Sequence, residues 1–102
     1  MRPEPKFSPD AQADVAYAVD YYNARRPNLG YDFLDEVQGL TSLIRESPFL
    51  FTLVDAPIRR ALLHRFPYGA FYVPGSSDDP DVIVAVVDLR QDPDVIRLAY
   101  RR

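Results

Sequence analysis

The sequence predicts an α+β domain in which two helices precede a small, mostly antiparallel sheet. Apolar residues recur at helical spacing in two stretches of the first half. The second half changes to extended runs rich in β-branched and aromatic residues, and a further helix-start signal appears only near residue 92. We expect residues 1–102 to form one domain, because a chain of this length supports a single hydrophobic core.

A short edge strand ending at Phe7 precedes the predicted helical hairpin. Ser8-Pro9-Asp10 starts the first helix, because serine can cap free amides, proline fits the first turn and aspartate opposes the positive end of the helix dipole. Residues 25–30 predict a tight corner, in which the glycine allows unusual backbone dihedrals. A second amphipathic helix follows over residues 31–46, so the two helices should pack antiparallel.

The sheet is predicted from the remaining apolar runs. Residues 49–54 are apolar but irregular, whereas residues 58–66 and 70–73 predict the two strands of a hairpin. Residues 82–87 are too apolar for a strand with one solvated face, and we interpret them as the central strand. Residues 92–94 repeat the cap, proline and acid of the first helix start and predict a short C-terminal helix. The hairpin should cover one face of the sheet and leave the other partly open to a ligand or partner.

The composition excludes several classes of protein. Hydrophobic residues make up 47% and charged residues 26% of the chain, as in ordinary globular domains. The chain has no cysteine and a single histidine, His64, which rules out disulfide scaffolds, zinc ribbons and thiol nucleophiles. We expect no metal and no cofactor. No apolar run approaches the roughly 18 residues that span a bilayer, so we expect a cytoplasmic protein with no membrane partner.

Charge is unevenly distributed along the chain. Residues 1–56 hold nine acidic and five basic residues, a net of −4, whereas residues 57–102 hold six acidic and seven basic residues, a net of +1. Residues 57–73 contain no acid at all. Guanidinium groups bind carboxylates or phosphates through paired hydrogen bonds, so this stretch predicts a site for an acidic peptide or a nucleic-acid backbone. A solubilised edge strand is the alternative interpretation.

Two further basic positions lie near the end of the predicted sheet. Arg90 directly follows the apolar run, where loops present side chains at a sheet's edge, and Arg97 lies in the last helix. His64 is interpreted as a surface or structural residue, because a lone histidine beside a cation lacks the orienting partner that acid–base catalysis needs. We assign no catalytic residue. The candidate binding residues are Arg59, Arg60, Arg65, Tyr72, Arg90 and Arg97.

Several motifs follow one another in a recognisable order. They are Phe7-Ser8-Pro9 at the first helix start, the corner Arg26-Pro27-x-Leu29-Gly30, Phe33-Leu34-Asp35-Glu36 in the second helix, Arg59-Arg60-Ala61-Leu62-Leu63-x-Arg65-Phe66-Pro67-Tyr68 with Tyr72, and Arg90-x-Asp92-Pro93 after the valine-rich run. This ordered set resembles the RelE/ParE superfamily of bacterial toxins over nearly the whole chain.

The resemblance implies the toxin of a type II toxin–antitoxin module, neutralised by a cognate antitoxin with which it forms a hetero-oligomer. RelE-like members cut mRNA on the ribosome with a cluster of basic residues, whereas ParE-like members bind DNA gyrase. This chain lacks lysines before Phe66, has Gly69 where RelE-like toxins carry an arginine, and has Ile96 where their C-terminal tyrosine falls. We therefore favour a ParE-like toxin that inhibits growth by binding gyrase. The alternatives are a ribosome-dependent mRNA endoribonuclease that uses the arginines with Tyr100, and a degenerate relative without toxicity.

Overall fold

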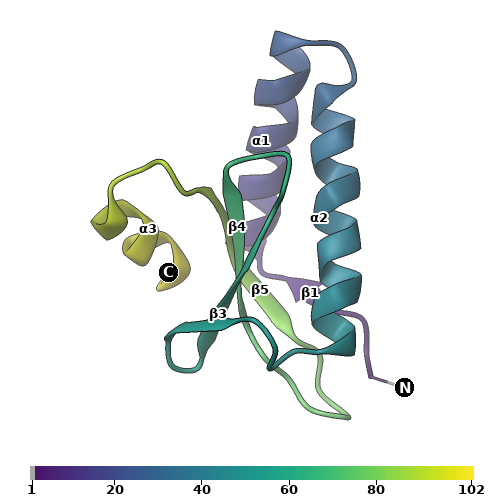
Figure 1. The fold of residues 1–102 in the computed structure, drawn as a ribbon, viewed down its shortest axis with the longest axis vertical. Coiled ribbons are helices and arrows are strands. Elements are labelled where there is room, and N and C mark those ends of the chain that lie inside the picture. The colour runs from purple at the N-terminus through teal and green to yellow at the C-terminus, as the bar shows by residue number, and fades with distance from the viewer. Residues whose placement is uncertain (1) are drawn as a thin grey trace.

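The structure is a computed structural model that describes residues 2–102, and it confirms the predicted α+β order of elements. Two antiparallel helices lie side by side on one face of the sheet, and the third helix lies across the sheet from them (Figure 1). None of these helices is long and apolar enough to cross a membrane. The elements are β1 (Lys6–Phe7), α1 (Pro9–Arg25), α2 (Leu29–Glu46), β2 (Thr52–Asp55), β3 (Ile58–Leu62), β4 (Tyr68–Val73), β5 (Val82–Asp88) and α3 (Pro93–Tyr100).

The sheet has five strands in the order β1-β5-β4-β3-β2, and only the β1–β5 pair is parallel. β1 pairs with β5 only at Val82 and Ile83. The run predicted as the central strand therefore lies next to the edge, and within residues 2–102 no strand continues alongside its outer edge past Ile83. β5 is apolar for a different reason, because α1 packs on one of its faces and α3 on the other.

Both predicted helix starts are confirmed by their capping hydrogen bonds. The Ser8 hydroxyl accepts a hydrogen bond from the backbone amide of Ala11 at 3.1 Å. The Asp92 carboxylate accepts one from the amide of Asp94 at 2.8 Å. In each case a side-chain oxygen satisfies an amide that has no partner within the helix.

The corner between α1 and α2 forms where the sequence predicted it, but its glycine has another role. Asn28, with φ 70°, adopts the left-handed conformation, and α2 begins at Leu29 rather than at residue 31. Gly30 has ordinary helical backbone, and a Cβ placed on it would lie 2.2 Å from the carbonyl oxygen of Val19 on α1. Gly30 is therefore required by the close approach of the two helices and not by the turn.

The predicted β-hairpin is confirmed, with shifted boundaries. β3 ends at Leu62, and β4 begins at Tyr68, so Tyr68 and Gly69 belong to a strand that was predicted to start at residue 70. Gly69 pairs with Leu62 on one side and Val87 on the other. The proline and glycine of this stretch suggested a longer break, but pairing with two neighbouring strands extends β4.

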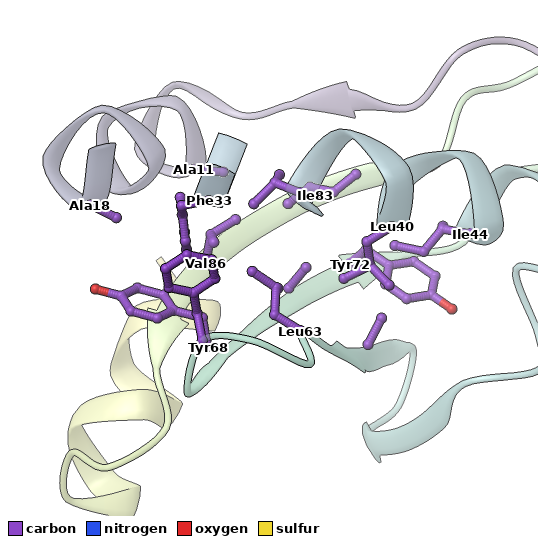
Figure 2. Packing of buried hydrophobic residues seen from close by; sticks show 14 of the residues in the cluster. Ala11, Ala18, Phe33, Leu40, Ile44, Leu63, Tyr68, Tyr72, Ile83 and Val86 are labelled. Carbon is purple, nitrogen blue, oxygen red and sulfur yellow. The ribbon is translucent and has the colours of Figure 1, made fainter. Parts of the chain in front are cut away.

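The main core lies between the helical hairpin and the sheet. Figure 2 shows Phe33, Tyr68 and Val86 grouped at one end of this core and Ile44 and Tyr72 at the other. The rings of Phe33 and Tyr68 are 5.0 Å apart between centroids and pack edge to face. Burial of these large side chains is the main stabilising contribution to the fold.

A second, smaller core occupies the face that was expected to stay partly open. The ring of Tyr100 on α3 stacks on Phe71 of β4, with centroids 4.8 Å apart and planes 21° from parallel. Ala85 and Val87 of β5 complete this cluster. The C-terminal helix thus covers part of that face with the protein's own apolar side chains.

Candidate functional site

The six candidate residues do not form one surface, because neighbours along β3 point to opposite faces of the sheet. Arg59 pairs with Tyr72, on the side of the helical hairpin, whereas Arg60 pairs with Phe71, on the side of α3. The cationic strip is therefore divided between two environments.

Arg59 is half-buried, and its side chain makes contacts within the protein. Its guanidinium group donates hydrogen bonds to the carbonyl oxygens of Phe49 at 3.1 Å and Phe51 at 2.8 Å, and it lies 5.2 Å from the centroid of the Phe49 ring. These contacts hold the segment that leads into β2. Arg60 differs, because its Nε atom is buried without a hydrogen-bond partner among the described residues.

Tyr72 is fully buried in the main core. Its hydroxyl donates a hydrogen bond of 2.6 Å to the carbonyl oxygen of Pro48, and burial raises the pKa of Tyr72 to about 12. The structure therefore places this side chain beneath the surface, where it links β4 to the end of α2.

Arg65 and Arg90 are brought together in one pocket, which we call the basic pocket. It has a volume of about 480 Å³ and forms where the C-terminal end of α1, the β3–β4 turn and the loop after β5 meet. Its four guanidinium groups come from segments that are far apart in the sequence. The lining residues are Tyr21, Tyr22, Arg25, Arg26, Leu29, Arg65, Phe66, Pro67 and Arg90.

Two carboxylates lie beside these four guanidinium groups. Arg90 donates to both oxygens of Asp88, at 3.0 and 2.7 Å. These hydrogen bonds lower the pKa of the Asp88 carboxyl and raise that of the Arg90 guanidinium. Asp32 lies 3.5 Å from Arg65 and 4.0 Å from Arg26. A third acid, Glu36, accepts a hydrogen bond from the backbone amide of Arg65. Three negative groups against four positive ones still leave an excess of positive charge.

A groove adjoins the basic pocket along the outer edge of β5, and we call it the edge groove. It has a volume of about 620 Å³ and lies between α1 and α3. Tyr17, which is 72% exposed, and Val95, which is 47% exposed, stand on its opposite walls. Tyr21 lines both the edge groove and the basic pocket, so the two form a continuous surface. The remaining lining residues are Ala13, Asp14, Tyr68, Val86, Val87, Asp88, Gln91, Ala99 and Arg102.

Two residues of the C-terminal helix lie outside both features. Arg97 is exposed on α3 and pairs with Asp94 at 2.8 Å, which raises the pKa of the guanidinium. Tyr100, the tyrosine considered for mRNA cleavage, is buried against Phe71 and does not line the basic pocket.

Arg25 and Arg26 were not predicted as candidate site residues. They were interpreted only as part of the corner between the two helices, because a residue next to a proline has an obvious local explanation. Their proximity to Arg65 and Arg90 depends on the packing of the hairpin against the sheet. No short-range pattern in the sequence carries that information.

Comparison with known proteins supports the fold. No protein-family model and no curated protein sequence matches the chain. A chain in the solved structure of the chromosomal ParDE TA system from P. aeruginosa superimposes on it with a TM-score of 0.71. The match covers 83% of this chain and 94% of that chain, at 16% sequence identity. At this identity the similarity establishes the fold. The chain therefore has a ParE-like α+β fold, as its sequence predicted.

Proposed function

We propose that this chain is the toxin of a bacterial type II toxin–antitoxin module and acts in the cytoplasm. In this proposal it inhibits growth by binding a cellular protein, DNA gyrase, and a cognate antitoxin neutralises it in a hetero-oligomeric complex. The observation that carries the proposal is the shared fold with a chain from a structure described as a ParDE toxin–antitoxin system. A shared fold does not by itself establish a shared function, so the proposal is tested at the residues of the site.

The basic pocket is the proposed contact site for an acidic surface of the partner. Arg65 and Arg90 are exposed there together with Arg25 and Arg26, and guanidinium groups form paired hydrogen bonds with carboxylates. Arg60 and Arg97 are proposed as outlying contacts on the α3 side of the sheet. Arg59 and Tyr72 support the site from within, through the contacts that fix β3 and β4.

Coexpression with the product of the adjacent small gene tests the toxin–antitoxin pairing. We expect the two proteins to copurify, expression of this chain alone to stop growth, and coexpression to restore it. If the proteins do not copurify and expression alone leaves growth unchanged, the proposal fails. Copurification without toxicity would instead identify a degenerate relative.

Pocket variants test the contact site and the target together. Arg65→Ala and Arg90→Ala should relieve growth arrest and reduce inhibition of gyrase supercoiling in vitro. Lys6→Ala removes one positive charge from an exposed position of β1, outside the pocket, and should leave both unchanged. Full toxicity of both pocket variants would show that the pocket is not the contact site.

The basic pocket also gives a reason to test mRNA cleavage. Phosphodiester cleavage requires cations at the developing negative charge and a group that moves a proton, and Tyr22 lies in the pocket with Arg90. Burial raises the pKa of Tyr22, which disfavours its ionised form, although Arg90 opposes this. Primer extension on cellular mRNA after induction separates the two functions. Cuts at fixed codon positions would establish the nuclease, whereas DNA damage without cuts would support gyrase.

A further inference from the structure

On the outer edge of β5, backbone groups form hydrogen bonds with side chains of this chain, at positions where a neighbouring strand would otherwise pair. Past the short pairing with β1, the backbone amide of Val86 donates to a carboxylate oxygen of Asp14 at 3.0 Å. The carbonyl oxygen of Val84 accepts from the guanidinium of Arg102 at 3.4 Å and from the Ser8 hydroxyl at 3.5 Å. Both groups are backbone positions that a sixth strand would use.

Asp14 and Arg102 also bind each other. Their closest nitrogen–oxygen distance is 2.7 Å, and a second pair of atoms lies at 3.2 Å. The side chain of Asp14 is only 17% exposed. One side chain thus supplies an acceptor and the other a donor, in the order in which a paired backbone would supply them. We call this pair the edge plug.

The surroundings of the edge plug suit an extended peptide. Asp14 and Arg102 both line the edge groove, whose walls carry Tyr17 and Val95. The groove leads into the basic pocket through Tyr21. Its apolar walls match alternate side chains of a strand, and the excess positive charge at its end matches an acidic residue of that strand.

We propose that the outer edge of β5 from Val84 to Asp88 is a docking edge for an extended segment of the partner antitoxin. The segment carries apolar side chains for the groove and an acidic residue for the basic pocket. In the free protein the edge plug occupies the place of its backbone, so binding must displace the Asp14–Arg102 pair. This inference rests on the proposed function, because it names the surface at which the antitoxin binds.

The first test uses Asp14→Ala and the antitoxin that copurifies with the chain. Removing Asp14 deletes the hydrogen bond and the ion pair that the segment must displace. We expect binding to become about three- to tenfold tighter by calorimetry. Asp20→Ala is the matched control, since Asp20 is an exposed acid on the same helix and does not line the edge groove. Unchanged or weaker binding of Asp14→Ala would overturn the inference.

Hydrogen exchange measures how well the backbone amides on the outer edge of β5 are protected. The amide of Val86 should exchange at least tenfold faster in free Asp14→Ala than in the wild type, and the antitoxin should slow it again. The amide of Asp88, two residues on and facing the same side, should slow in both complexes. If the antitoxin binds but does not slow exchange of these amides, the docking-edge inference fails. The edge plug would then only prevent unwanted strand pairing, and the toxin–antitoxin proposal would still stand. If no antitoxin binds the wild type, both proposals fail.

Arg102→Ala covers the case in which Asp14→Ala does not fold. This variant opens the plug from its other side and leaves the Val86–Asp14 hydrogen bond available. It should also tighten antitoxin binding, and unchanged affinity would count against the inference.

Discussion

Glu36 on α2 accepts a hydrogen bond of 3.2 Å from the backbone amide of Arg65, although 29 positions separate the two residues. The same carboxylate accepts a hydrogen bond from the amide of His64. The second helix therefore holds the β3–β4 turn, and this turn carries Arg65 into the basic pocket. His64 is exposed, which agrees with the first of the two interpretations, a surface or a structural residue.

Glu36→Ala should loosen that turn without unfolding the domain. Loss of two hydrogen bonds to a charged acceptor near the surface should reduce the free energy of unfolding by about 1–2 kcal/mol. The amides of His64 and Arg65 should exchange faster in hydrogen-exchange measurements. Asp35→Ala, an exposed acid one position earlier, is the control and should leave these amides unchanged. Equal exchange in the wild type and Glu36→Ala would contradict the assigned role.

Two glycines of α2 should respond oppositely to the same substitution. Gly30→Ala places a methyl group against the Val19 carbonyl and should reduce the free energy of unfolding by about 2–3 kcal/mol. Gly39 has open space around it, so Gly39→Ala should stabilise the helix by about 0.5–1 kcal/mol. Chemical denaturation of both variants measures the difference. Destabilisation of both by the same amount would show that the helix–helix approach at Gly30 is not the cause.

Tyr72→Phe should destabilise the protein in a pH-dependent way. At neutral pH the variant leaves the Pro48 carbonyl without its donor and should lose about 1–2 kcal/mol. The folded-state pKa of Tyr72 is about 12, above its ordinary value of 10.0, so its protonated form is the one that folding favours. Its contribution is complete below about pH 10 and disappears as the pH rises through 12.

The stability difference between the wild type and Tyr72→Phe should therefore shrink between pH 10 and 12. Denaturation curves at pH 7, 10 and 11.5 measure it. Tyr68, whose pKa is also raised to about 12 by burial, titrates in both proteins and provides an internal control. A constant difference in the free energy of unfolding across this range would show that folding does not raise the pKa of Tyr72.

Arg90→Ala should raise the pKa of Asp88 toward its ordinary value. In the wild type the hydrogen bonds from Arg90 lower that pKa below 3.8. The ionised carboxylate therefore stabilises the fold above about pH 4, and the contribution is lost as the pH falls through the folded-state pKa. Carbon-13 NMR titration of the Asp88 carboxyl measures the shift. Arg97→Ala is the control, because Arg97 pairs with Asp94 instead, and an unchanged Asp88 titration in Arg90→Ala would refute the coupling.

The order and type of the elements follow from local signals along the chain. The signals at Ser8 and Asp92 are local, since a cap and its amide lie within three residues. Helical spacing and β-branched runs likewise depend on near neighbours, so the hairpin and the late strand were predictable. Boundaries at residues 29 and 68 moved because tertiary contacts extended those elements beyond their local signals.

The roles of the charged and aromatic side chains depend instead on how the elements pack together. Arg59 and Tyr72 turn inward because the face on which they lie packs against the hairpin, and alternation along a strand does not specify which face is buried. The basic pocket joins Arg25 to Arg90 across the folded chain, which no spacing in the sequence encodes. The edge plug likewise forms between residues 88 positions apart. Local patterns set the elements, whereas long-range packing determined the surfaces they present.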